Sequence, residues 1–260
     1  ARPLALMMIA TGTSIAIILG LPLGRIIGLT IGWRMTFLCI GIFAASIAIY
    51  LGFCLPKVPS RGGFSFRQLP QLLRNKPLVR LYIFTLLVVT GYYTGYSYIE
   101  PFMGQVAHLS ENMITTTLMV FGIMGIIGSF AYSRFYPKRP YLFMCVAILI
   151  ITTCLSSLGL AASIPVLAMA ICGFWGMAVN GFNVAMQQEV IDNSSTEATA
   201  VAMSIYSGIY NLGIGSGTFL GGAVCTYLSI SHIGYIGGTI VFAGLLFWLI
   251  KVIRSRIIGI

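Results

Sequence analysis

The chain has 260 residues, of which 58% are hydrophobic and only 8% are charged, and its formal net charge is +10. Soluble domains carry about 25% charged residues, so the composition excludes an ordinary water-soluble domain and a disordered chain. The basic residues gather in short clusters between long apolar runs, which argues against a nucleic-acid-binding protein. This pattern is typical of a protein that crosses a membrane several times.

Neither the cysteines nor the histidines have the spacing of a metal site. The six cysteines include no C-x-x-C pair, and His108 and His232 lie far apart in polar connections. We find no nucleophile–base pair and no phosphate-binding loop after a strand. The sequence therefore predicts a protein that is not an enzyme and that carries no metal and no cofactor.

Eight segments are long and apolar enough to cross a bilayer, which takes about 20 residues in a helix. In chain order the predicted spans are Leu4–Leu29, Met35–Leu55, Leu81–Met103, Met113–Tyr132, Tyr141–Ala162, Pro165–Gln187, Ala198–Leu228 and Gly234–Val252. The first and the seventh are long enough to tilt or to continue beyond the lipid.

The loops set the orientation. If the first span leaves the cytoplasm, every Lys and Arg except Arg25 and Arg34 lies on the cytoplasmic side. Cytoplasmic loops of membrane proteins carry such an excess of basic residues. We therefore expect a multi-pass protein whose C-terminus is cytoplasmic.

One basic connection, residues 57–79, divides two spans from six. It is either a solvated linker or a short amphipathic helix on the inner leaflet. Six spans are a natural half of a transporter built from repeats. The predicted organisation is the last two helices of an N-terminal half (1–56), a cytoplasmic linker (57–79) and a six-helix C-terminal half (80–260). We accordingly expect a fragment whose first four helices are missing.

Residues 11–37 contain a Gly- and Pro-rich helix, with Gly12, Gly20, Pro22, Gly24 and Gly28, followed by Gly-Trp-Arg and Phe37. This segment resembles the antiporter motif and following turn of the major facilitator superfamily, in its drug/proton antiporter branch. GLPLGR and GWRMTF are most similar to bacterial sugar efflux transporters, and later runs such as SGIYNLGIGSG extend the resemblance along the chain. The resemblance implies an all-α membrane protein of the major facilitator fold, with eight of twelve helices, in the bacterial inner membrane.

The spacing of the glycines also has a physical interpretation that does not depend on the resemblance. Gly20, Gly24 and Gly28 recur at i, i+4 and i+8, so one face of the helix admits close approach by another helix. Pro22 removes a backbone hydrogen bond and bends the helix nearby. Such a surface suits a helix that rocks against a partner, and it equally suits static packing.

Polar side chains inside spans are candidates for substrate contact. In the sixth span Asn180, Asn183 and Gln187 share one helical face, and Asn211 lies in the seventh span. Amides offer donors and acceptors, and tyrosines offer a ring and a hydroxyl. The predicted substrate-binding residues are Tyr92, Tyr93, Tyr96, Asn180, Asn183, Gln187 and Asn211. The alternative is that the amides bridge helices and the tyrosines form an interfacial belt.

Glu100 is the only acid in or near a predicted span, and we consider it a candidate for proton coupling or for a gate. About 28 Å of helix separate it from the inner end of its span, which places it near the outer edge. The scarcity of acids at mid-depth favours a neutral, hydroxylated substrate over a cationic drug.

The leading hypothesis is a secondary transporter that exports sugars or sugar-like solutes by alternating access, driven by protons. Its partners are the small-molecule substrate, protons, the lipid bilayer and the missing N-terminal helices, with no nucleic acid. The alternatives are a multidrug or other metabolite exporter of the same fold, and an inactive truncated remnant.

Overall fold

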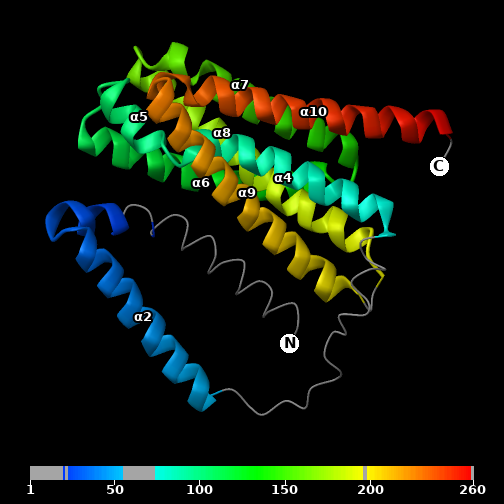
Figure 1. The fold of residues 1–260 in the computed structure, drawn as a ribbon, viewed down its shortest axis with the longest axis horizontal. Helices are drawn as coiled ribbons and strands as arrows, with labels where there is room; N and C mark the ends of the chain where they lie inside the picture. The colour runs from blue at the N-terminus through cyan, green and yellow to red at the C-terminus, as the bar shows by residue number, and fades with distance from the viewer. Residues whose placement is uncertain (1–19, 21–22, 55–73, 196–197, 259–260) are drawn as a thin grey trace. The chain divides into compact units, whose positions relative to one another are not determined.

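The computed structural model describes residue 20 and residues 23–54, 74–195 and 198–258 (Figure 1). The described part is almost entirely helical and contains no strand, which confirms the all-α prediction. The chain divides into two compact units, Ala1–Phe66 and Arg67–Ile260. The predicted linker lies mostly outside the described residues, and the assignment of the units to two halves of a transporter stays a prediction.

In the first unit a helical stretch over residues 23–30 turns at Gly32 into α2 (Trp33–Cys54). Gly32 has φ +102°, a conformation that glycine adopts without steric cost. The hydroxyl of Thr36 donates a hydrogen bond to the carbonyl of Gly24 at 3.4 Å across this turn. Gly12 and Pro22 of the predicted antiporter motif lie outside the described residues.

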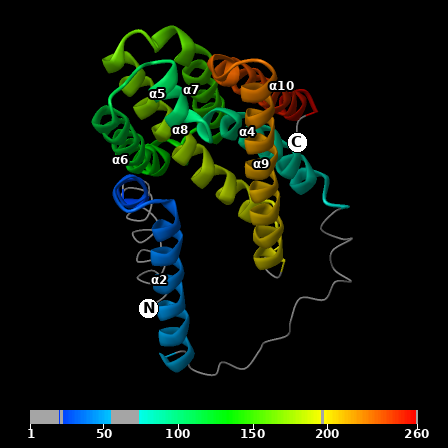
Figure 2. The same cartoon turned by 60° about the vertical axis from the view of Figure 1, so that its left-hand side comes forward.

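In the described residues of the second unit there are six long helices and two short ones. They are α4 (Lys76–Tyr96), α5 (Ile99–Gln105), α6 (Glu111–Phe135), α7 (Pro140–Ala161), α8 (Pro165–Asp192), α9 (Thr199–Tyr227), the 3₁₀ helix η2 (Ile230–His232) and α10 (Ile233–Ile258). Figure 2 shows the same helices from a second direction.

The third predicted span is interrupted, because α4 ends before Ser97 and α5 begins after Tyr98. Pro101 has no N–H to donate to the carbonyl four residues earlier, and its ring clashes with that carbonyl. A continuous helix through Ser97 is therefore unfavourable. The backbone N–H of Tyr98 instead bonds the carbonyl of Gly95 at 3.2 Å.

The six long helices pack against one another mainly in pairs. The most extensive contacts join α6 to α8, α4 to α9, α10 to both α7 and α4, and α7 to α8. Large buried side chains fill the space between them, among them Trp248 and Phe84, whose rings stack at 4.9 Å. Phe182 meets the edge of Phe84 at 5.8 Å. These rings join α4 to α10 and α8 in one buried core.

Glycines allow α9 to lie directly against the backbone of α4. A Cβ added at Gly217 would lie 2.5 Å from the carbonyl oxygen of Thr90, and one at Gly221 would lie 2.6 Å from that of Thr94. Gly213 meets the side chain of Val89 in the same way. These positions are spaced by four, so one face of α9 forms the small-residue contact that membrane helices use in place of a hydrophobic driving force.

Within the described residues, six segments are long and apolar enough to cross a membrane. They are Trp33–Cys54, Lys76–Gln105, Glu111–Phe135, Pro140–Ala161, Pro165–Asp192 and Ile230–Ile250. The seventh predicted span corresponds to α9, whose glycine, serine and tyrosine content leaves it less apolar than these. The first predicted span lies mostly outside the described residues. The remaining apolar runs agree with the predicted multi-pass membrane protein.

Candidate functional site

The predicted tyrosines of α4 lie together. Tyr92 is buried, with 2% of its surface exposed, and its hydroxyl is hydrogen-bonded to the hydroxyl of Tyr210 on α9. The ring centroids of Tyr92 and Tyr93 are 4.6 Å apart, and those of Tyr93 and Tyr96 are 5.5 Å apart. Tyr93 and Tyr96 are half-buried. One face of α4 thus presents ring surfaces and hydroxyls toward α9.

The aromatic contacts continue from α4 to α6 and α8. The ring of Tyr96 lies 5.1 Å from that of Phe121 and 5.9 Å from that of Trp175, measured between centroids. Trp175 is fully buried, and its Nε1 has no hydrogen-bond partner within the described part of the chain. An unsatisfied buried donor costs free energy, so this indole would gain from a hydrogen-bond acceptor supplied by a ligand.

Asn183 joins the same group from α8. Its Oδ1 accepts a hydrogen bond from the hydroxyl of Tyr206 at 3.1 Å and a longer one from Nε2 of Gln187 at 3.4 Å. The rings of Tyr206 and Tyr210 lie 5.9 Å apart. We call this connected set the tyrosine cluster; its members are Tyr92, Tyr93, Tyr96, Phe121, Trp175, Asn183, Tyr206 and Tyr210.

Of the other predicted amides, Gln187 reaches the cluster through Asn183, and Asn180 and Asn211 lie outside it. Nδ2 of Asn180 donates to the carbonyl of Gly125 at 2.7 Å, which links α8 to α6. Nδ2 of Asn211 donates to the carbonyl of Ser207 on its own helix, and Asn211 is exposed beside a hollow on α9 that includes Gly215 and Phe219. The hydrogen bond of Asn180 bridges two helices, which is the alternative role of the predicted amides. A substrate-binding role for Asn180 and Asn211 stays a prediction.

The acids of the described second unit lie at helix ends. Glu100 is exposed in the first turn of α5, Glu111 is in the first turn of α6, and Glu189 and Asp192 are in the last turn of α8. Tyr136, just beyond α6, donates to Oε1 of Glu189 at 2.9 Å. Burial raises the pKa of Tyr136, and the Glu189 carboxylate raises it further, so this phenol stays neutral. None of these acids is a member of the tyrosine cluster as defined above.

Four members of the cluster were not predicted as site residues: Phe121, Trp175, Tyr206 and Tyr210. The spacing of Tyr206 and Tyr210 by four on α9 carried a signal, since it places both rings on one helical face. Phe121 and Trp175 look like ordinary core residues in the sequence. Their contact with Tyr96 depends on how α6 and α8 pack against α4, which no single segment encodes.

The hydrogen bond between Asn183 and Tyr206 is expected to couple α8 to α9. In a double-mutant cycle of Asn183→Leu and Tyr206→Phe, we expect a coupling free energy of about 1 kcal/mol, the usual net value of one buried hydrogen bond. The measurement is the unfolding free energy of the four proteins in detergent. The pair Asn180→Leu with Tyr206→Phe is the control and should be additive; equal coupling in both pairs would contradict the contact.

Comparison with known proteins agrees with this architecture. Residues 1–201 match the Major Facilitator Superfamily. The chain is also 42% identical over 254 residues to a protein of Mannheimia succiniciproducens named "Probable sugar efflux transporter". The match covers 97% of this chain and 64% of the relative, so the chain spans less than two thirds of that protein. The chain belongs to the Major Facilitator Superfamily, as the resemblance of its motifs predicted.

Proposed function

We propose that this chain is part of a proton-coupled secondary transporter that exports sugars or sugar-like solutes by alternating access. The tyrosine cluster is the observation that carries the proposal. It combines flat ring faces with hydroxyls from α4 and α9, an amide from α8 and an unsatisfied indole N–H. Sugars present apolar ring faces and many hydroxyls, and these groups match them. The name of the Mannheimia relative supports the same substrate class.

The distribution of charge favours a neutral substrate. A desolvated cation needs a carboxylate close by, and the acids of the described second unit lie in terminal turns. Among the described residues no acid belongs to the tyrosine cluster, so its members offer a lipophilic cation no counter-charge. We therefore rank a multidrug exporter second, and we propose Glu100 for the proton-coupling or gating role among the described acids.

The proposed orientation puts the basic helix ends in the cytoplasm. Lys76 and Arg80 lie in the first turns of α4, and Lys138 and Arg139 precede α7. The positive-inside rule then places the C-terminus in the cytoplasm of a bacterium and the chain in its inner membrane.

The experiment is export of a labelled sugar from cells that express the gene encoding this chain. Tyr93→Ala should reduce the export rate about tenfold, which corresponds to about 1.4 kcal/mol of lost interaction, because Tyr93 contacts both Tyr92 and Tyr96. Tyr227→Ala is the matched control, since Tyr227 is 84% exposed and outside the cluster.

No export of any of several sugars by the unchanged protein would end the proposal. A thermal-shift panel of sugars against lipophilic cations separates the sugar exporter from the multidrug exporter. Dissipating the proton gradient with an uncoupler tests the driving force, and Glu100→Gln tests the assigned acid. If the protein folds and binds sugar but never exports it, the export step of the proposal is wrong and the alternative of an inactive protein holds.

A further inference from the structure

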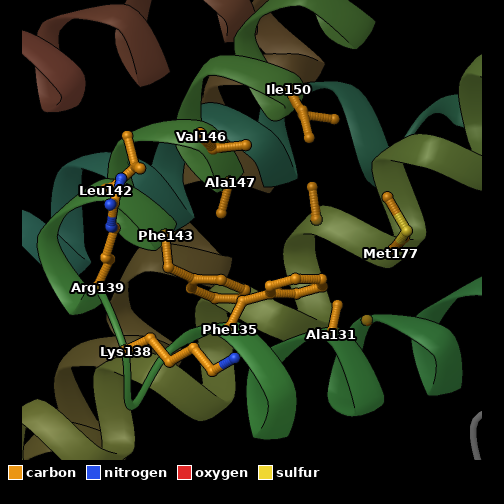
Figure 3. A pocket seen from close by; sticks show the side chains of 12 residues that line it. Ala131, Phe135, Lys138, Arg139, Leu142, Phe143, Val146, Ala147, Ile150 and Met177 are labelled. Atoms are coloured by element: carbon orange, nitrogen blue, oxygen red, sulfur yellow. The ribbon is translucent and has the colours of Figure 1, made fainter.

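A separate cavity of about 480 Å³ lies between the C-terminal end of α6, the first half of α7 and the middle of α8 (Figure 3). Its walls are apolar: Phe135 comes from α6, Leu142, Val146 and Ile150 come from α7, and Met177 comes from α8. The tyrosine cluster shares none of its lining. We refer to this cavity as the α6–α8 groove.

The groove is open toward the surface of the helix bundle. Phe135 is 59% exposed, Leu142 is 52% exposed and Val146 is 45% exposed, although each lines an apolar cavity. The far wall is tight because Gly128 of α6 lies against the backbone of Met177. An apolar recess with exposed apolar walls on a membrane-spanning helix bundle is filled by hydrocarbon rather than by water.

Two cations lie at one end of the groove. Lys138 and Arg139 lie in the short connection between α6 and α7, both are exposed, and both line the cavity. Figure 3 shows them on the side opposite Ile150 and Met177. Neither cation forms an ion pair with an acid in the part of the chain that the structure describes. The nearby acids have other partners: Glu189 accepts from Tyr136, and Asp192 accepts from Gln188 at 2.7 Å.

The two cations and the apolar walls together indicate which kind of ligand the groove binds. The cations attract a phosphate at the level of the membrane surface, and the apolar walls below them accept an acyl chain. In the orientation proposed above, on which this inference rests, the cations face the inner leaflet. Anionic headgroups concentrate basic segments at such a surface.

We propose that the α6–α8 groove binds one anionic phospholipid of the inner leaflet. Its phosphate lies against Lys138 and Arg139, and one acyl chain runs along Leu142, Val146 and Ile150. The lipid thereby covers the seam between α6 and α7, which otherwise have few direct contacts with each other.

The test is native mass spectrometry of the purified protein in detergent, with phosphatidylglycerol or phosphatidylcholine of identical acyl chains added separately. We expect one bound phosphatidylglycerol, at least about tenfold tighter than phosphatidylcholine. The double variant Lys138→Gln/Arg139→Gln should lower phosphatidylglycerol binding to the phosphatidylcholine level. Lys76→Gln/Arg80→Gln removes the same charge from exposed positions on α4 and should leave the preference intact.

A second variant addresses the acyl chain. Ala131→Trp projects a large ring into the groove and should weaken both lipids, while thermal unfolding verifies that the protein remains folded. Equal binding of the two lipids by the unchanged protein would overturn the proposal. Equal loss in the two charge variants, or occupation of the groove by a second copy of the chain, would overturn it too. This experiment measures lipid binding and does not depend on transport. Its outcome can therefore be distinguished from a failure of the sugar-export proposal.

Discussion

Gly217→Ala is expected to destabilise the second unit by about 3 kcal/mol, and Gly217→Leu is expected to prevent its folding. A Cβ at this position would lie 2.5 Å from the carbonyl oxygen of Thr90 and 2.8 Å from Cβ of Tyr93. The obstructing atoms include backbone, so α9 has to move away from α4, and overpacking of this kind costs about 1–3 kcal/mol or more. The measurement is the unfolding midpoint of the purified protein in detergent.

Gly215→Ala is the matched control, two residues away on the same helix. Apart from the adjacent backbone of α9 itself, no atom of the described residues lies within 4 Å of a Cβ added at Gly215. Alanine is favoured over glycine in a helix by about 1 kcal/mol, so this variant should be neutral or slightly stabilised. Equal unfolding midpoints for the two alanine variants would show that α9 and α4 are not in contact through their glycines.

Trp175→Ala is expected to cost about 3–5 kcal/mol in the free energy of unfolding, the range found for large aromatic residues removed from a core. Trp175 is fully buried and its ring contacts those of Tyr96 and Phe121. Its loss leaves a cavity beside the tyrosine cluster. Chemical unfolding in detergent, followed by the fluorescence of the remaining tryptophans, measures the effect.

Trp33→Ala provides the comparison, because Trp33 is 64% exposed at the start of α2. Its replacement should change stability by less than about 0.5 kcal/mol, as surface substitutions usually do. Trp175→Phe keeps a ring in place but removes the N–H, so it should lose less stability, and under the proposed function it should also weaken sugar binding. A stability loss for Trp33→Ala as large as that for Trp175→Ala would refute the placement of the core.

The sequence is sufficient to locate most helices. Apolar run length and flanking charge place α6, α7 and the start of α8 within a few residues of their observed bounds. The helices α8 and α10 continue beyond their predicted ends, because a helix can leave the lipid without stopping while polar residues such as Gln188 extend it. The interruption at Ser97 escaped prediction, although Pro101 carried the signal for it.

The candidate site was less predictable, for a physical reason. Helical periodicity shows which residues share a face, so it correctly groups Tyr92, Tyr93 and Tyr96, whose rings are in contact. It does not show which neighbouring helix meets that face. Asn180 and Asn183 lie on one stripe of α8, yet one bonds the backbone of α6 and the other bonds Tyr206 of α9. Such partners are fixed by tertiary packing.

The interruption between α4 and α5 is fastened to α9 by two hydrogen bonds. The hydroxyls of Ser97 and Thr218 are 2.7 Å apart, and the hydroxyl of Tyr98 donates to the carbonyl of Thr218 at 3.2 Å. A translation or rotation of α9 would therefore act on the interruption at Ser97 and Tyr98, and not on the middle of a continuous helix. We therefore expect α5, the short helix that carries Glu100, to change its tilt when Thr218 moves. Ser97 and Tyr98 would be the hinge of this movement.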